Sequence, residues 1–163
     1  MQGDLRRLTQ TFARTGKVEW IGVRPDRRAP MRVLERVEIA PSGLVGDRRT
    51  QPGKRAVSLI QWEHLPVIAA LAGHDQIDPA QLRRNIVVSG INLLGLRKAR
   101  FRLGSAILQG TGLCAPCSRM EETLGPGGYT VVRGHGGITA EVLEPGELAL
   151  GDAVLPMLEP TET

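Results

Sequence analysis

The stretch Gly137-Ile-Thr-Ala-Glu-Val-Leu-Glu-Pro-Gly-Glu-Leu-Ala-Leu-Gly-Asp-Ala-Val-Leu155 decides the fold class that this sequence predicts. It holds two mainly apolar stretches, residues 138–143 and 147–155, with a Pro-Gly turn between them. Short apolar runs with β-branched residues, bounded by Gly and Pro, are typical of β-strands joined by tight turns. The same pattern recurs over most of the chain, which favours a strand-rich fold over a helical bundle.

Further strands are predicted outward from this stretch. Their expected ranges are 17–23, 33–39, 56–61, 85–88, 101–103, 106–109 and 129–133. One solid helix is expected over residues 62–72, with Pro66 in its first turn and its end at Gly73. Other helical segments are expected over 4–15, where a loose arm is the alternative, over 78–83 and over 118–124. About eight short strands and few helices predict a mainly β protein, a closed β-barrel, because closure removes exposed sheet edges.

Length and composition are those of one globular domain. The chain has 163 residues, 41% hydrophobic and 23% charged, with 20 Gly and 11 Pro. We expect an arm or short helix over 1–16, the barrel over 17–155 and a flexible tail over 156–163. No apolar run approaches the roughly 20 residues of a membrane span, and residues 1–7 show no signal-peptide core. We therefore expect a cytoplasmic protein without a membrane partner.

Charge is distributed unevenly along the chain. The formal net charge is +4, yet residues 121–163 hold eight acidic residues and only one basic residue, Arg133. The excess of basic residues therefore lies in the first 120 residues, and it consists mostly of Arg, whose planar fork matches phosphate and carboxylate. With two Trp, one Tyr and two Phe, the chain lacks the rings of a base-stacking platform. We expect no nucleic-acid partner.

Both cysteines lie in one loop, Cys114-Ala-Pro-Cys117. Two thiolates supply half of a tetrahedral zinc site, but the three histidines lack the spacing of a ligand pair. A thioredoxin-like pair needs a βαβ context, which is not visible here. A third interpretation is one reactive thiolate that binds a soft metal or carries sulfur, with Arg119 nearby to favour the anionic thiolate. Two buried structural thiols are the alternative.

Arginines recur at the ends of predicted strands. Arg48 follows a Gly-Asp turn, Arg55 opens a strand, and Arg83 and Asn85 precede an apolar strand. The mouth of a barrel gathers strand ends, and converging guanidinium groups suit a ligand that carries a phosphate. Solvated strand ends are the alternative interpretation.

The glycine run Gly134-His-Gly-Gly137 lacks the Lys-Ser/Thr pair of a phosphate-binding loop. It can still present backbone N–H groups to an anion, and a tight turn between strands is the alternative. His135 is its one titratable residue and is therefore a candidate site residue.

Taken together, the ordered segments of this chain resemble the MOSC domain family, the module found at the end of molybdenum-cofactor sulfurases and in short bacterial stand-alone proteins. No single segment is decisive, but their order across residues 17–155 is specific. The matching segments are Ser42-Gly-Leu-Val-Gly-Asp-Arg48, Arg55-Ala-Val-Ser-Leu-Ile60, Leu82-Arg-Arg-Asn-Ile-Val-Val88 with Gly90-Ile-Asn-Leu93, Gly112-Leu-Cys-Ala-Pro-Cys117 and Gly146-Glu-Leu-Ala-Leu-Gly-Asp152.

The resemblance implies a barrel of the pyruvate-kinase-insertion type with a molybdenum–pyranopterin cofactor at one end. The family's Pro-Cys step maps onto Cys117, which is then the expected catalytic cysteine and the molybdenum ligand or sulfur acceptor. The expected cofactor-binding residues are Arg48, Arg55, Arg83 and Asn85, to which we add Arg119 and His135.

The first functional hypothesis is a molybdenum-dependent oxidoreductase that reduces N-hydroxylated small molecules such as amidoximes. Electrons would come from a separate donor protein, because no flavin, haem or iron–sulfur motif is visible. Reductases of this kind usually carry additional segments, so we expect a smaller substrate surface here or a second subunit, and a homodimer is left open. The alternatives are a sulfur-carrier module with a persulfide on Cys117 and a basic binding protein without catalysis.

Overall fold

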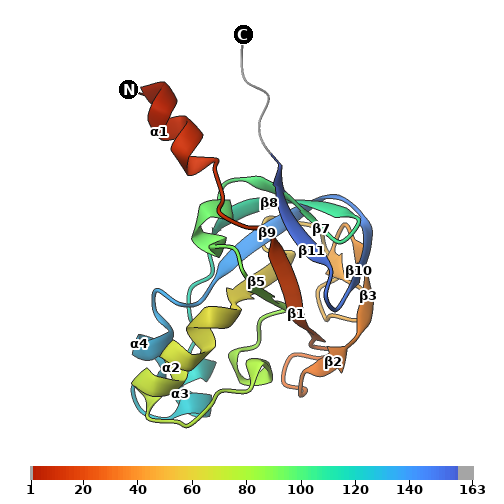
Figure 1. Ribbon diagram of the computed structural model, residues 1–163. Coiled ribbons are helices and arrows are strands. Elements are labelled where there is room, and N and C mark those ends of the chain that lie inside the picture. The colour runs from red at the N-terminus through yellow and green to blue at the C-terminus, as the bar shows by residue number, and fades with distance from the viewer. Residues whose placement is uncertain (1, 158–163) are drawn as a thin grey trace.

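Seven strands close into a barrel in this computed structural model, which describes residues 2–157 (Figure 1). Around the wall the strands follow the order β11, β7, β8, β9, β5, β6 and β1, and β1 pairs with β11 to close the ring. All of these pairings are antiparallel except that of β5 with β6. The predicted closed β-barrel is confirmed. The strands are β1 (Gly16–Val23), β5 (Val57–Gln61), β6 (Ile86–Ser89), β7 (Arg100–Leu103), β8 (Ala106–Leu113), β9 (Ile138–Glu144) and β11 (Ala153–Met157).

A second, three-stranded sheet contributes to the same core. It pairs β10 (Gly146–Ala149) with β3 (Arg36–Ala40) and β3 with β4 (Gly43–Leu44), while β2 (Arg32–Leu34) extends the barrel sheet beyond β1. Successive side chains of a strand point to opposite faces. In β3 this buries Val37 and Ile39 in the barrel core and leaves Arg36 and Glu38 exposed.

Strands β5 and β6 are buried on both faces, which explains their continuous apolar sequences. Leu59 and Ile86 point into the barrel core. Ile60 and Val87 point outward into a second apolar cluster, formed with the helices. A strand with two covered faces needs apolar residues at every position, so this pair of strands joins the barrel to the helical part.

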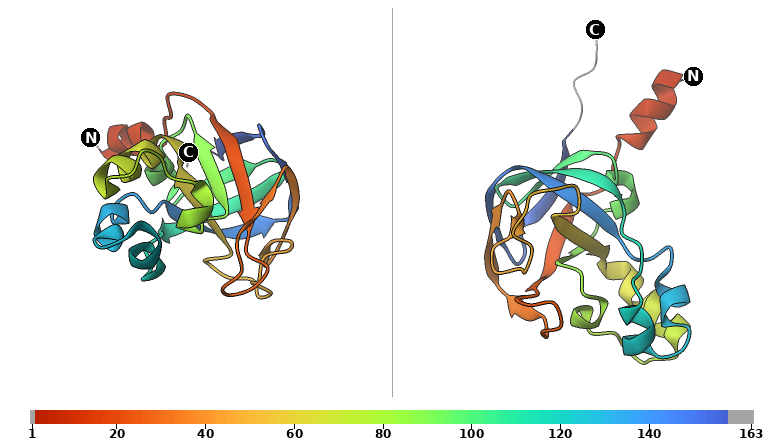
Figure 2. Two further views of the ribbon diagram at one scale, coloured as in Figure 1. Left: turned by 90° about the horizontal axis from the view of Figure 1, so that it is seen from below. Right: turned by 180° about the vertical axis from the view of Figure 1, so that it is seen from behind.

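The helices α2, α3 and α4 gather at one end of the molecule, and α1 projects from the other end (Figure 2). The predicted helix over 62–72 is confirmed as a 3₁₀ turn followed by α2, with Gly73 in the left-handed conformation at its end. The helical segments are α1 (Gln2–Thr9), η1 (Trp62–His64), α2 (Leu65–Ala72), η2 (Pro79–Leu82), η3 (Leu93–Leu96), α3 (Arg119–Leu124) and α4 (Gly128–Val132).

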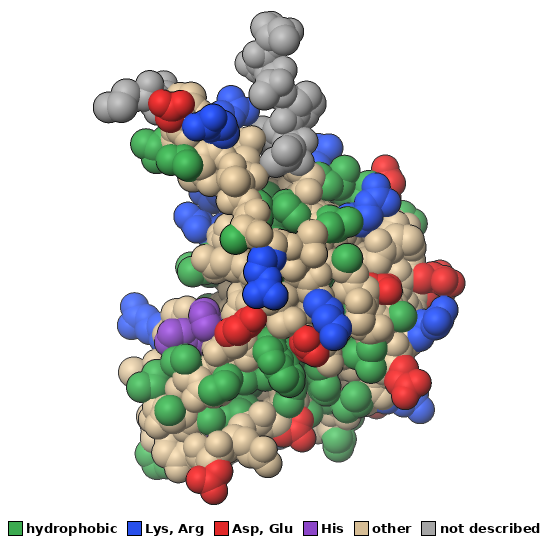
Figure 3. Space-filling model, in the orientation of Figure 1, with side chains coloured by type: hydrophobic (Ala, Val, Ile, Leu, Met, Phe, Trp, Pro, Cys, Tyr) green, Lys and Arg blue, Asp and Glu red, His purple; other side chains and the backbone are tan. Residues whose placement is uncertain are grey.

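Helix α1 stands away from the barrel and ends at Thr9, before the predicted limit of residue 15. Leu5 and Leu8 are exposed on it, and hydrophobic side chains are visible on this projection in Figure 3. Phe12 returns the chain to the body by packing against the barrel core. Within residues 2–157, none of the helices has the length and apolar character needed to span a membrane.

The predicted strand over 129–133 is wrong, because this segment forms helix α4. Its sequence has β-forming residues, but tertiary contacts override that preference. Both carboxylate oxygens of Glu121 accept hydrogen bonds at the start of α4, from the N–H groups of Gly127 at 2.8 Å and Tyr129 at 3.1 Å. Val132 is then buried in the helical cluster.

Two other expected strands are divided, and the expected tail begins later. The range 33–39 forms two strands, β2 and β3, and 147–155 is interrupted by a turn at Gly151, whose φ is +86°. The predicted tail over 156–163 overlaps β11, which extends to Met157. The rest of that prediction, residues 158–163, lies outside the described part of the chain.

Candidate functional site

A cavity of about 490 Å³ lies where the ends of several barrel strands meet the loop that carries the cysteines. Its size is in the range of about 300–1,000 Å³ that is typical of ligand sites. Asp47 is the one carboxylate among its lining residues, so guanidinium groups dominate the charge and favour an anionic ligand. We call it the arginine cavity, after six lining residues: Arg24, Arg48, Arg49, Arg55, Arg83 and Arg84.

Five of the predicted site residues meet in this cavity: Arg48, Arg55, Arg83, Asn85 and Cys117. Arg48 and Arg55 are exposed, whereas Asn85 is buried at its base. The other two predicted residues, Arg119 and His135, are not among the lining residues.

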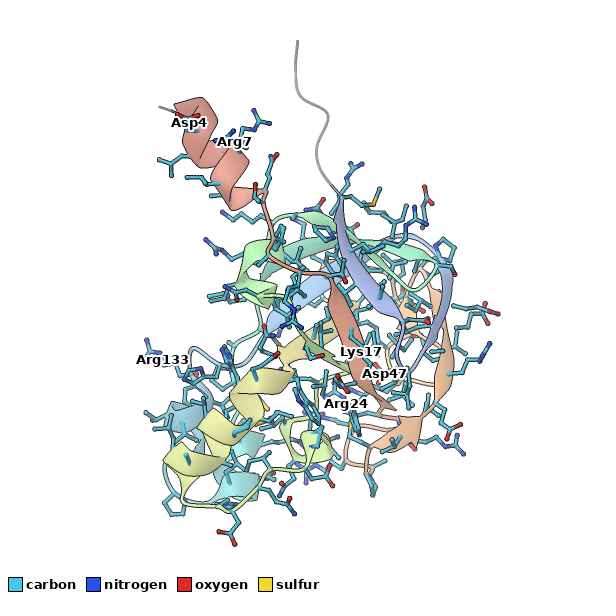
Figure 4. All side chains as sticks on the ribbon, viewed as in Figure 1. Asp4, Arg7, Lys17, Arg24, Asp47 and Arg133 are labelled. Atoms are coloured by element: carbon cyan, nitrogen blue, oxygen red, sulfur yellow. The ribbon has the colours of Figure 1, made fainter. Side chains whose placement is uncertain are left out.

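Arg24 holds two walls of the arginine cavity together. Its backbone N–H donates to Asp47 Oδ1 at 2.8 Å, and its carbonyl accepts from the N–H of Arg48 at 2.6 Å. Figure 4 shows Arg24 and Asp47 close together. Burial lowers the pKa of the Arg24 guanidinium, and the Asp47 carboxylate opposes this shift. Arg24 was not among the predicted site residues. It directly follows β1, whereas the predicted arginines follow a turn or precede a strand.

Arg83 adopts a left-handed backbone conformation, with φ 57° and ψ 31°, at the end of η2. Such a conformation costs a residue with a side chain about 1 kcal/mol. Its Nη2 donates to the carbonyl of Ala29 at 3.3 Å, which fixes the loop between β1 and β2. Burial, followed by the nearby charges of Arg24 and Arg119, lowers the pKa of Arg83. A bound anion would relieve this repulsion.

Asn85 braces the strands at the base of the cavity. Its Oδ1 accepts from the N–H and the hydroxyl of Ser58 on β5, at 3.1 and 3.2 Å, and its Nδ2 donates to the carbonyl of Gly22 on β1 at 3.2 Å. These bonds occupy its carbonyl oxygen and one amide hydrogen. Asn85 therefore positions β1 and β5, and its second amide N–H takes no part in these bonds.

Arg84 is buried and supports the cysteine loop from below. Its Nε donates to the carbonyl of Gly136 at 2.8 Å, its Nη1 to that of Leu82 at 3.1 Å, and its Nη2 to that of Ala115 at 3.1 Å. Three carbonyl groups thus satisfy one buried guanidinium without a carboxylate. Because Ala115 lies between the two cysteines, Arg84 fixes the position of both thiols relative to the cavity.

Both cysteines line the arginine cavity, but their exposure differs. Cys114 is buried and Cys117 is exposed, and both are free thiols. The charge of Arg119 acts on Arg83, and its Nη2 donates to the carbonyl of Arg27 at 3.3 Å. Arg119 therefore contributes charge and loop support near the cavity rather than a lining surface.

The glycine run at residues 134–137 forms a turn, which was one of its two interpretations, and it packs against the cysteine loop. The N–H of Cys114 donates to the carbonyl of Gly137 at 2.9 Å. A Cβ on Gly136 would clash with the carbonyl oxygen of Cys114. The ring of His135 instead meets that of His64 edge-on, with centroids 5.1 Å apart. His135 thus belongs to a histidine pair outside the arginine cavity.

The guanidinium groups and the thiol of the cavity fit an anionic ligand that carries a soft metal. Nε of Arg24 and Nε of Arg83 are buried without a hydrogen-bond partner, which leaves two donors for a phosphate. The thiol of Cys117 is a soft ligand. In residues 2–157 no three His, Cys, Asp or Glu side chains gather as a metal site. A metal held here would therefore need further ligands from the bound molecule.

The structure is a closed barrel with a cavity lined by six arginines and both cysteine thiols. The chain belongs to the MOSC domain family, whose model matches residues 31–155. The fold is shared with the YuaD protein from Bacillus subtilis, at 20% identity and a TM-score of 0.76 over 88% of this chain and 97% of that one. It is also shared with YiiM from Escherichia coli, at 17% identity and a TM-score of 0.67 over 90% and 72% of the two chains. No curated protein sequence gives a significant match.

Proposed function

We propose that this protein binds a molybdenum–pyranopterin cofactor in the arginine cavity and reduces N-hydroxylated small molecules, with electrons from a separate donor protein. One observation carries the proposal: six arginines and the exposed thiol of Cys117 line the same cavity. Membership of a family that is associated with molybdenum cofactor supports it.

Each lining residue has a distinct part in this proposal. The free Nε groups of Arg24 and Arg83 would donate to the phosphate of the cofactor, and the exposed Arg48 and Arg55 would neutralise its charge at the mouth. Cys117 would bind the metal through its thiolate. When bound, the cofactor supplies the two-electron chemistry, while the protein provides position and electrostatics.

Reduction of benzamidoxime tests this proposal without knowledge of the natural donor. The reaction takes two electrons and two protons, and it yields benzamidine and water. Protein purified from a host that makes the cofactor should catalyse it with reduced methyl viologen as electron source. Cys117→Ala should abolish turnover, whereas Arg102→Gln, an exposed arginine on β7 outside the cavity, should retain it. Activity that survives Cys117→Ala would contradict the role given to this thiol.

The exposure of Cys117 beside cationic side chains also favours a second candidate, a sulfur carrier with a persulfide on this residue. Intact-mass spectrometry separates the two. A mass increase of one sulfur atom that Cys117→Ala removes, in protein without molybdenum, would favour the carrier. Molybdenum-loaded protein without added sulfur would favour the reductase.

A further inference from the structure

A second cavity, of about 400 Å³, borders the cysteine loop. Cys114 and Ala115 line both this cavity and the arginine cavity, so the loop forms a wall that the two share. We call the second cavity the tyrosine hollow, and the lining residues used below are Leu113, Pro116, Tyr129 and Arg133.

The tyrosine hollow has an apolar surface that is open to solvent. Leu113 is 62% exposed and Tyr129 is 43% exposed, although both are large hydrophobic side chains. Pro116 adds a further apolar group from the loop itself. An aromatic ring and a leucine side chain beside one cavity suit a flat apolar ligand.

Helix α4 brings a guanidinium group to the same place. The N–H of Arg133 donates to the carbonyl of Tyr129 at 3.2 Å, so the two residues are one helical turn apart. Side chains at this spacing on a helix are about 6 Å apart at Cβ, whereas in a strand the same residues would be separated by roughly 13 Å. Glu121 fixes the start of this turn through its bond to the N–H of Tyr129.

The guanidinium of Arg133 is free to bind a ligand. It is exposed, it has no hydrogen bond or ion pair in the described part of the chain, and the hollow has no carboxylate among its lining residues. Figure 4 shows its side chain at the edge of the molecule beside α4. Arg133 is also the one basic residue of residues 121–163. An unpaired guanidinium next to an exposed ring matches a carboxylate attached to an aromatic group.

We propose that the tyrosine hollow binds a flat aromatic carboxylate, with the ring on Tyr129 and Leu113 and the carboxylate on Arg133. Such a ligand lies against the loop that ends in Cys117. This second part of the inference rests on the proposed function, which gives the substrates as N-hydroxylated small molecules. Within that class, the substrates would be aromatic compounds that carry an acidic group.

Benzoate is a direct probe of the hollow, because Tyr129 is the single tyrosine and its ring signals in an NMR spectrum belong to one site. Benzoate should shift these signals saturably in cofactor-free protein. Arg133→Gln should weaken the apparent affinity by about tenfold, the loss expected from one charge-assisted hydrogen bond. Neutral benzamide should bind the original protein more weakly by a similar factor, and Arg102→Gln should leave the titration unchanged. No shift of the Tyr129 signals, or equal binding of benzoate by Arg133→Gln, would overturn the proposal.

A kinetic comparison then tests the substrate class. With reduced methyl viologen as donor, Arg133→Gln should raise KM for 4-carboxybenzamidoxime by about tenfold at unchanged kcat. Its KM for benzamidoxime should not change. An equal rise in KM for both substrates would overturn the inference that the substrates carry an acidic group. Benzoate binding without any turnover would contradict only the proposed function, because the titration needs no cofactor.

Discussion

At the scale of single residues, Arg84 is the buried charge that organises the candidate site. Its three hydrogen bonds join the segment before β6 to the cysteine loop and to the glycine turn before β9. Arg84→Met should lower the free energy of unfolding by about 3 kcal/mol, because three carbonyl groups lose their donor. Urea denaturation measures this loss.

Arg84→Lys should not restore the stability, because one ammonium group cannot reach three divergent carbonyl groups. Arg102→Met, at an exposed position on β7, is the matched control and should change the stability by less than about 0.5 kcal/mol. Full stability of Arg84→Lys would show that the fork geometry is unimportant.

We expect His64 to make the stability of the protein depend on pH. Burial, and then the proximity of His135, lowers the pKa of His64 below its ordinary value of 6.5, and Glu63 opposes this shift. The unfolded chain therefore takes up the proton first as the pH falls. The contribution of neutral His64 to stability is complete above pH 6.5. It is lost as the pH drops through the lowered pKa of His64 in the folded protein.

His64→Gln should remove the loss of stability that protonation of His64 causes at low pH. Urea denaturation at about pH 7.5 and about pH 5.5 should show a smaller difference in His64→Gln than in the original protein. An identical decline in the two proteins would exclude His64 as its source.

At the scale of elements, the glycine turn sets the place of the cysteine loop. Gly136→Ala should push the loop outward, because the new Cβ clashes with the carbonyl of Cys114 and comes within 3.2 Å of Arg84 Nη2. The buried Cys114 thiol should then react faster with a thiol reagent such as DTNB. In the original protein one thiol, Cys117, should react fast and the other slowly.

Gly134→Ala is the control for that displacement. Gly134 has φ +86° and open space around its Cβ position, so alanine adds backbone strain of about 1 kcal/mol without a clash. The reaction rate of Cys114 should be unchanged in this variant. If the reaction rate of Cys114 rises equally in both variants, backbone strain rather than the clash at Gly136 causes the rise.

Strand β5 connects the barrel to the helical cluster through its outward face. Ile60→Ala should cost about 3 kcal/mol, because Ile60 is fully buried among the helices. Val67→Ala on the exposed side of α2 should cost far less, since Val67 is 39% exposed. Urea denaturation compares the two, and similar losses would contradict the two-faced burial of β5.

Local sequence patterns were sufficient to predict the barrel and many of the residues that line the arginine cavity. The Gly and Pro turns predicted the strands, and strand-end positions predicted Arg48, Arg55 and Arg83. The role of Arg84 was not predictable, because it depends on carbonyl groups about 30 and 50 residues away in sequence. Helix α4 was missed because Glu121 and the packing of Val132, rather than its own propensity, make it helical.

At the scale of the whole molecule, part of the basic excess in the first 120 residues is concentrated in one cavity. Arginines from four separate segments converge in the cavity with one carboxylate beside them. The thiol loop forms one wall of that cavity and one wall of the tyrosine hollow. The barrel thus places a candidate cofactor site and a candidate substrate site on the same loop, residues 113–117.

The molybdenum content of the purified protein tests the central claim most directly. Elemental analysis of protein from a cofactor-producing host should find close to one molybdenum per chain. Cys117→Ala and Arg83→Ala should lose most of it while circular dichroism shows an unchanged fold, and Arg102→Gln should keep it. Absence of molybdenum from the original protein, or an unchanged content in Cys117→Ala, would contradict the account.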